Sequence, residues 1–204
     1  MNLYNKHLPR VNRILGDEEY LKYIHEIEEL ERDRIFCRHN MEHFLNVARI
    51  ACLLDHDDSY DASEPVDSPD ASKPAGSLDS SKPEDSLDSS KTAGSHETSS
   101  RAEIIYAAAL LHDIGRGHEY LTGVRHEEES ARLASPIIRR AGFNDEEEGL
   151  IISAIANHRN KECPEGRLDS IIYRADKLSR PCYYCKASQL CHKTDDKKNL
   201  ELKI

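Results

Sequence analysis

Residues 101–116 read RAEIIYAAALLHDIGR, and this stretch decides the fold. Its side chains are apolar almost without interruption over IIYAAALL, which predicts a helix over residues 101–113 that is buried on all sides. The helix ends, however, at His112 and Asp113. Two ionisable side chains at the end of a buried helix are costly unless they are paired or bound to a metal ion. We therefore expect a site at the end of a central core helix.

The sequence on both sides of this stretch predicts further helices. Apolar residues recur at helical spacing in each of them and no segment alternates with a period of two, so the predicted class is all-α. Asp17 and Asp145 are suited to cap two of these helices, and Gly142 is suited to end one. Gly115 and Gly117 predict a loop after the central helix. The expected helices cover residues 17–34, 37–54, 126–141, 145–158 and 168–178.

The middle of the chain, residues 55–100, has a different composition. It contains a nine-residue repeat, SKPAGSLDS at 72–80 and SKPEDSLDS at 81–89, followed by a partial copy, SKTAGS, at 90–95. Sequence of this kind buries too little apolar surface to offset the entropy of ordering, which predicts a disordered insert. We expect one discontinuous domain made of residues 1–54 and 101–180, interrupted by this acidic insert. A cysteine-rich tail, residues 181–204, follows the domain.

The insert also explains the charge of the protein. It carries 12 acidic residues and three lysines, so it accounts for nine of the ten net negative charges. The nearly neutral remainder gives no electrostatic footprint for nucleic-acid binding. No apolar run approaches the roughly 20 residues of a membrane span, and the N-terminus lacks the apolar core of a signal peptide. We therefore expect a cytoplasmic protein that binds neither nucleic acid nor membrane, with its six cysteines as thiols or metal ligands.

Six residues of the kinds that bind metal ions lie in or beside predicted helices. Neutral imidazoles and carboxylates hold iron, manganese or zinc, and two such ions can generate a hydroxide nucleophile and clamp a phosphoryl group. This set makes a metal-dependent phosphohydrolase the leading hypothesis. Its members are His43, His112, Asp113, His126, His158 and Asp176.

The segments around these residues resemble the HD-domain superfamily of metal-dependent phosphohydrolases. The first histidine lies in EHFLNVARIA, the HD doublet in ALLHDIGR and the last aspartate in YRADKLSR. VRHEEESA and AIANHR supply the two further histidines of the form that houses two metals. This extended order is similar to that of the bacterial HD enzymes that hydrolyse diadenosine tetraphosphate symmetrically at a di-iron site. The resemblance covers residues 35–54 and 101–180 and implies an HD-domain helical bundle.

The resemblance also implies roles for individual residues. It places His43, His112, Asp113 and Asp176 around one divalent ion, iron or manganese. Asp113 would bridge to a second such ion, held by the two further histidines. Arg116 would neutralise phosphate charge as it develops. Alongside Asp113 and Arg116 we expect Lys177 to contribute to catalysis.

Several neighbouring residues have competing interpretations. Lys177 and Arg159 are suited to contact phosphate, but they are equally suited to be surface residues. His118 is suited to protonate a leaving oxygen, although an exposed loop position is the simpler expectation. His39 precedes His43 by one helical turn. The resemblance leaves it outside the ligand set, as a supporting or substrate-binding group.

The tail contains a second set of candidate ligands. Cys182, Cys185 and Cys191 lie in CYYCKASQLCH with C-x2-C-x5-C spacing. Cys163 or His192 would complete a set of four ligands for structural zinc. Unligated thiols are an equal alternative, and an iron–sulfur cluster is a weaker one. The two remaining cysteines, Cys37 and Cys52, are interpreted as ordinary residues on helix faces.

The leading function is hydrolysis of a phosphoester or phosphoanhydride in a nucleotide, with a dinucleoside polyphosphate as the favoured substrate. Deoxynucleotides, cyclic nucleotides and guanosine tetraphosphate stay open as substrates. Two alternatives belong to other classes: a non-catalytic HD module that senses a metal ion or nucleotide, and a di-iron oxygenase. The sequence does not indicate an oligomeric state.

Overall fold

The computed structural model describes residues 7–60, 93–164 and 167–202, and in this part of the chain all regular structure is helical. The all-α class is therefore confirmed. The nine-residue repeats at 72–89 lie outside the described residues, so the predicted disorder of the insert stays a prediction. The α-helices are α1 (Pro9–Leu15), α2 (Glu18–Leu30), α3 (Met41–Tyr60), α4 (Ala93–Leu111), α5 (Arg116–Thr122), α6 (His126–Ala141), α7 (Asp145–Asn157) and α8 (Leu168–Leu178). Three single-turn 3-10 helices follow, η2 (Cys182–Tyr184), η3 (Ser188–Leu190) and η4 (Asp195–Lys197).

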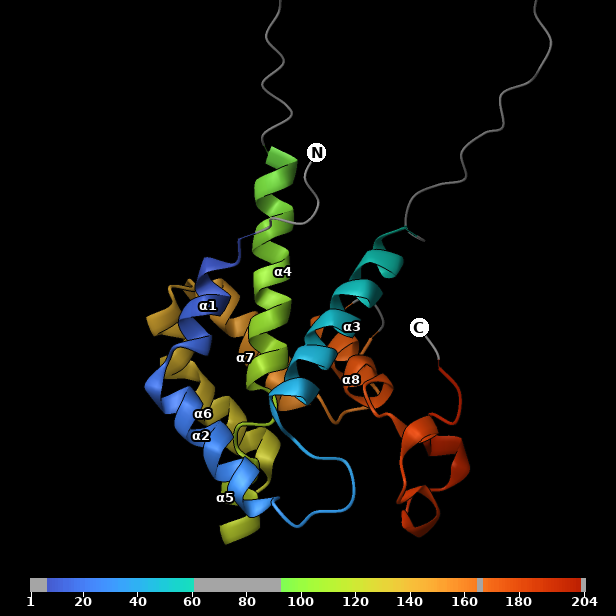
Figure 1. Ribbon diagram of the computed structural model, residues 1–204. Helices are drawn as coiled ribbons and strands as arrows, with labels where there is room; N and C mark the ends of the chain where they lie inside the picture. The colour runs from blue at the N-terminus through green and yellow to red at the C-terminus, as the bar shows by residue number, and fades with distance from the viewer. Residues whose placement is uncertain (1–6, 61–92, 165–166, 203–204) are drawn as a thin grey trace, which may run out of the picture.

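Helix α4 is the centre of the bundle (Figure 1). It packs against α3 and α7 most extensively and also against α1, α6 and α8. Its last five residues, from Ala107 to Leu111, are completely buried. The three successive alanines among them let the neighbouring helices approach closely, because they add little volume between the backbones. The prediction of a central core helix from its apolar sequence is confirmed.

Helix α1 was not predicted from the sequence. It buries only Val11 and Ile14, which is too few apolar positions to establish a helical period. Two partly buried ion pairs supplement this packing. The guanidinium of Arg10 contacts Glu103 of α4 at 2.6 Å and Glu147 of α7 at 2.6 Å. Helix α1 thus connects the middle of α4 with the start of α7, and the C-terminal ends of both helices lie at the candidate ligands.

Several helix boundaries differ from the predicted ones. Helix α3 continues to Tyr60 and α4 begins at Ala93, so both helices extend into the segment assigned to the insert. The predicted loop after the central helix was wrong, because Arg116 begins helix α5. Asn144, rather than Asp145, caps α7, and it forms a capping box with Glu147. By contrast, α6 and α8 have the predicted bounds.

Among the described residues, no helix combines the length and the apolar character that a membrane span requires. The cytoplasmic location stays a prediction.

Candidate metal centre

Five helices bring the six predicted ligands together. His43 lies in the first turn of α3, His112 and Asp113 follow α4, and His126 begins α6. His158 caps the C-terminus of α7, and Asp176 lies in the last turn of α8. Each ligand is therefore at or near a helix end that faces the end of α4. The two sets that they form are His43, His112 and Asp176, and Asp113, His126 and His158; within each set the candidate ligand atoms lie within 4.8 Å of one another.

The first set has the unsatisfied groups expected of a metal site. His43 Nε2 lies 3.7 Å from Asp176 Oδ1. The described residues offer no hydrogen-bond partner to Nε2 of His43 or of His112, although both atoms are buried. An unsatisfied buried polar atom costs about 1–3 kcal/mol. A cation coordinated by both nitrogens and the carboxylate would remove that cost, so these residues fit a metal ion.

The second set surrounds one carboxylate oxygen. Asp113 Oδ1 lies 3.1 Å from His126 Nε2 and 3.4 Å from His158 Nε2. The two imidazole Nε2 atoms are themselves 3.3 Å apart. Three side chains that are essentially inaccessible to solvent thus direct a carboxylate oxygen and two ring nitrogens at one another. Two nitrogens and one oxygen are a suitable donor set for iron, zinc or manganese.

The other ring nitrogen of each histidine decides which nitrogen is left for a metal. His112 Nδ1 lies 2.7 Å from the carbonyl oxygen of Ala109, and His158 Nδ1 lies 2.7 Å from that of Ile155. A carbonyl oxygen only accepts, so each Nδ1 carries the proton and donates it. The lone pair of each ring is then on Nε2, the atom that points into the ligand set. The rings are fixed in the tautomer that binds metal.

Glu119 performs the same task for His126. Its Oε2 lies 2.9 Å from Nδ1 of that ring. The sequence-based interpretation missed this carboxylate, because it placed the residues after Gly117 in a loop. Helical spacing was the available signal: Glu119 is one turn beyond Arg116, whose guanidinium it contacts at 3.1 Å.

Gly115 allows α6 to approach the end of α4. A Cβ atom at this position would lie 2.6 Å from the backbone nitrogen of Ser130 and 2.7 Å from the carbonyl oxygen of His126. Neither backbone atom could move without shifting α6. The backbone nitrogen of Gly115 also donates to Ser130 Oγ at 2.9 Å. The glycine that follows the HD doublet thus holds the second ligand set close to Asp113.

Comparison with known proteins agrees with this arrangement. Residues 40–180 match the HD domain family. The chain belongs to this family. An uncharacterised protein from Clostridium beijerinckii (strain ATCC 51743 / NCIMB 8052) is 35% identical over 195 residues, which is 96% of this chain and 99% of the relative. No solved structure matches the chain. HD domains bind divalent metal ions and are commonly hydrolases, and the clusters described above are candidate sites for such ions.

The two ligand sets together are called the HD centre. The charge states of its residues suit cation binding. Burial opposes ionisation of Asp113, but His112 and the Arg116 guanidinium hold the pKa of that carboxyl well below its usual range. Burial likewise opposes ionisation of Asp176, whereas the lysine that follows it and His112 hold its pKa low. Burial and the nearby His112 lower the pKa of His43 to about 4. At neutral pH the carboxylates are charged and His43 is neutral, which are the forms that bind metal ions.

Cationic side chains surround the HD centre. Arg116 Nε lies 3.2 Å from Asp113 Oδ1, and its side chain is 22% exposed. Lys177 contacts the carboxylate of Asp176, and its Nζ lies 4.9 Å from the centre of the Tyr173 ring. Arg180, which the sequence-based interpretation missed, lies 3.5 Å from Asp176 Oδ2 at the helical spacing of four residues. These three cations are positioned for an anionic ligand.

Two other residues weighed from the sequence have ion-pair partners. Arg159 is 55% exposed and lies 3.8 Å from Glu127, in agreement with a surface role. His118 is in helix α5, rather than in a loop, and its Nδ1 contacts Glu129. It is half-buried beside Tyr23. Neither residue is among the candidate ligand groups of the described chain.

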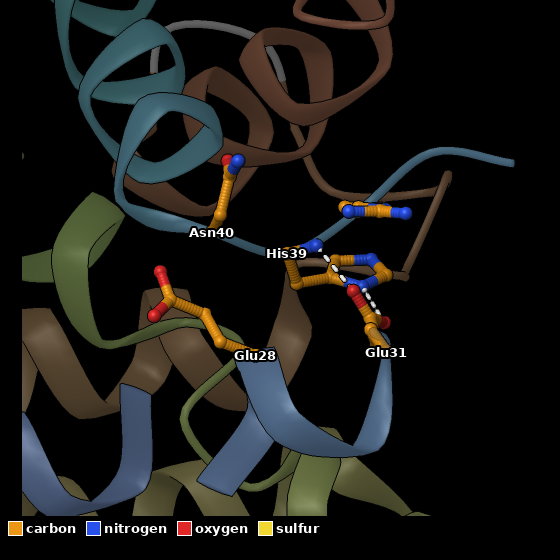
Figure 2. A pocket seen from close by; sticks show the side chains of 5 residues that line it. Glu28, Glu31, His39 and Asn40 are labelled. Carbon is orange, nitrogen blue, oxygen red and sulfur yellow. Dashed lines mark hydrogen bonds and ion pairs between the residues drawn. The ribbon is translucent and has the colours of Figure 1, made fainter. Parts of the chain in front are cut away.

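His39 lies closer to the HD centre than its place outside the predicted ligand set suggests. Its Nε2 is 3.5 Å from Asp113 Oδ2, and it forms a further candidate group with His43 and Asp113. Glu31 fixes the ring: one carboxylate oxygen lies 2.6 Å from His39 Nδ1 and the other accepts from the His39 backbone nitrogen at 2.6 Å (Figure 2). A cavity of about 190 Å³ opens beside these residues and is also lined by Arg38. His39 therefore has the buried, oriented imidazole of a residue that supports the centre.

The cysteines predicted to bind zinc are not drawn together as closely as the ligands of the HD centre. None of the candidate groups among the described residues, each with ligand atoms within 4.8 Å of one another, includes a cysteine. None of the six cysteines is in a disulfide, and each is partly buried. Cys37 also differs from its interpretation as a helix-face residue, because it precedes helix α3.

Proposed function

We propose that this HD domain is a metal-dependent phosphohydrolase that cleaves a phosphoester or phosphoanhydride of a nucleotide. The observation that carries the proposal is the pair of ligand sets joined through consecutive residues: His112 belongs to one and Asp113 to the other. Two divalent ions held this close would supply a hydroxide nucleophile and neutralise charge on the phosphoryl group. Iron and manganese suit the mixture of imidazole and carboxylate donors.

The residues of the chain itself have three tasks in this reaction. Asp113 belongs to the second ligand set and lies 3.4 Å from His112 of the first, so its negative charge would stabilise a cation in either set. Arg116 is partly exposed beside Asp113, so its guanidinium can meet a phosphate oxygen and stabilise charge that develops during the reaction. Lys177 and Arg180 lie on the other side, next to Asp176, where they can orient a further phosphate.

For the substrate we favour a dinucleoside polyphosphate. The support is the order of histidine, HD doublet, two further histidines and distant aspartate, which this chain shares with the symmetrical diadenosine tetraphosphate hydrolases. Cations on both sides of the ligand sets agree with a substrate that carries several consecutive phosphates.

The test is a turnover assay on purified full-length protein. Iron(II) or, in a separate sample, manganese(II) is added under anaerobic conditions. Substrates are diadenosine tetraphosphate, deoxynucleoside triphosphates, cyclic nucleotides and guanosine tetraphosphate, with products separated by chromatography. We expect Asp113→Asn to reduce turnover by about 10³-fold or more, and Arg116→Ala by about 10²-fold, the range seen when transition-state charge stabilisation is removed. Glu42→Gln is the matched control, because this exposed carboxylate neighbours His43 without belonging to a ligand group.

Turnover of one substrate class that is lost in Asp113→Asn and kept in Glu42→Gln supports the proposal and names the class. Two bound metal ions per chain without turnover of any substrate would contradict it. Oxygen consumption by the reduced protein in that case would identify an oxygenase instead.

A further inference from the structure

The tail from residue 181 to residue 202 has a defined backbone and almost no core. Its regular structure is limited to the three single-turn 3-10 helices. Ala187 is its only buried hydrophobic residue, whereas Tyr184 is 80% exposed and Leu190 is 72% exposed. Apolar packing of one alanine cannot offset the entropy of ordering about twenty residues. Short segments without a core are held together by disulfides or metal ions.

The three cysteines of the tail lie at its tight turns. The backbone nitrogen of Cys185 donates to the carbonyl oxygen of Cys182 at 3.2 Å, and that of Ser188 donates to Cys185 at 3.1 Å. The nitrogen of Cys191 in turn donates to Ser188 at 3.3 Å. Successive one-turn bends at cysteines, with C-x2-C spacing, are typical of structural zinc sites. The backbone of the tail therefore suits a metal ion, but these three residues leave one of four positions unfilled.

Cys37 lies in a segment next to the tail, close enough to interact electrostatically with Cys182 and Cys185. Residues 34–36 and Arg38, on either side of it, line one hollow together with Lys186, Ala187 and Leu190 of the tail. Figure 1 shows this segment between α2 and α3 running beside the tail. Burial raises the pKa of the Cys37 thiol, and so do the nearby thiols of Cys182 and Cys185. The two segments thus bring four cysteines into one neighbourhood.

Cations gather around these cysteines. The side chain of Lys198 is only 9% exposed, and that of Arg180 is only 15% exposed. Lys193 is close enough to interact electrostatically with both Cys191 and Cys37. Lys198 lies 2.9 Å from Asp195 and Arg180 lies 3.5 Å from Asp176, so both cations already have a carboxylate partner. A zinc ion bound by four thiolates carries two net negative charges, which the surrounding cations would stabilise further.

Cys163, the fourth ligand expected from the sequence, lies at the wrong end of α8. It precedes the N-terminus of this helix, whereas Cys182 follows its C-terminus. An 11-residue helix is about 16 Å long, which is too far for one ion to span. The charged groups that act on Cys163 are Asp169 and Arg167 rather than other cysteines. His192, the other expected candidate, is exposed.

We propose that Cys37, Cys182, Cys185 and Cys191 bind one structural zinc ion as four thiolates. The sulfur atoms must draw together on binding, because no candidate group within 4.8 Å includes a cysteine. The ion would fasten the tail to the segment that also carries His39, two residues beyond Cys37 and 3.5 Å from Asp113. This site is separate from the HD centre, and the zinc proposal does not depend on the phosphohydrolase assignment.

The test is cobalt(II) substitution of the full-length protein, monitored by the thiolate-to-cobalt charge-transfer absorption in the near ultraviolet. The HD centre has no thiolate and does not contribute to this band. Zinc-edge X-ray absorption provides the second measurement, with four sulfur neighbours expected at about 2.3 Å. We expect Cys37→Ser to weaken metal binding at the tail by at least about a hundredfold, more than the loss of a supporting partner costs.

Cys163→Ser and His192→Ala are the matched controls and should retain the full band. Cys37→His keeps a zinc ligand and should restore binding, which separates loss of a ligand from a failure to fold. Loss of the band in Cys163→Ser with its retention in Cys37→Ser would overturn the assignment of the fourth ligand. An iron–sulfur chromophore, a disulfide among these cysteines in the purified protein, or no sulfur-bound metal would overturn the zinc proposal.

Discussion

The HD centre and the cysteine tail both collect metal-type side chains, but they are built in opposite ways. At the HD centre apolar packing is already complete: the end of α4 is fully buried, and the ligands are attached to helix ends around it. In the tail the ligands come from bends, and Ala187 is the only buried hydrophobic residue. Helices that pack without metal can hold ligands ready for chemistry. A segment without a core depends on its cross-link.

Metal removal should separate the two regions most strongly. We expect exhaustive chelation to leave the helical content of the bundle intact while the tail loses its structure, because structural zinc contributes about 10–16 kcal/mol to folding of small zinc-dependent domains. Hydrogen exchange followed by mass spectrometry reads both regions at once. Backbone amides of residues 181–202 should lose protection, whereas those of α4 should keep it. Equal loss of protection in both regions would show that the bundle depends on bound metal for its structure as much as the tail does.

Truncation of one apolar side chain in each region gives the next largest effect. Phe44 is fully buried, and its ring centre lies 5.6 Å from that of His112. Phe44→Ala should lower the free energy of unfolding by about 3–5 kcal/mol, because it leaves a cavity in the core. Leu190→Ala, at a site 72% exposed, should change it by no more than about 0.5 kcal/mol. Urea denaturation measures both variants. A large effect of Leu190→Ala would reveal a core in the tail.

These two regions also differ in how far the sequence predicts them. The bounds of α6 and α8 follow from their helical periods, and the six predicted ligands come together because each lies at or near a helix end. Helix α5 was missed, since Gly115 and Gly117 indicate a loop when the close approach of α6 is not known. Because α5 was missed, Glu119, the carboxylate that orients His126, was missed as well.

The position of Cys37 beside the tail is a tertiary relation. More than 140 residues separate it from Cys182, and no local pattern connects them. Motifs on helices can be read from the sequence because the period of the helix places the side chain. Ligands that lie in bends have no such period, so the sequence offers Cys163 or His192 as the fourth ligand and does not indicate that Cys37 lies near the tail.

A smaller effect should follow from loosening the junction between bundle and tail. The side-chain amide of Asn199 donates to the carbonyl oxygens of Lys177 at 2.8 Å, Leu178 at 3.1 Å and Arg180 at 2.9 Å. Lys177 and Leu178 end α8, where carbonyl oxygens lack partners within the helix, and Arg180 follows the helix by two residues. Asn199→Ala should destabilise the tail locally by about 1–3 kcal/mol, the cost of leaving such groups unsatisfied.

Hydrogen exchange should show faster opening of residues 181–202 in Asn199→Ala, with no change in α4. Asn160→Ala serves as the control for loss of an asparagine in a bend of the bundle. If Asn199→Ala leaves exchange in the tail unchanged, the cross-link alone holds the tail, and hydrogen bonds to the end of α8 contribute nothing to its stability.

The smallest predicted effect depends on pH and belongs to the bundle alone. Hydrogen bonds from Arg132, at 2.6 Å, lower the pKa of Glu129 to about 2 against the opposing effect of burial. Since the unfolded chain binds more protons below its normal pKa of about 4.3, the stabilisation is complete above that pH and is lost as pH falls towards 2. At pH 7 Glu129→Gln should cost about 1 kcal/mol or less, since Arg132 is largely exposed.

Urea denaturation at a series of pH values should therefore show the difference between wild type and Glu129→Gln shrinking below about pH 4.3. Asp195→Asn is the matched variant in the tail, where the carboxylate is 78% exposed although it lies 2.9 Å from Lys198 Nζ. Its effect should stay within about 0.5 kcal/mol at every pH. A pH-dependent effect of Asp195→Asn as large as that of Glu129→Gln would mean that ion pairs, and not thiolates bound to zinc, supply the stability of the tail.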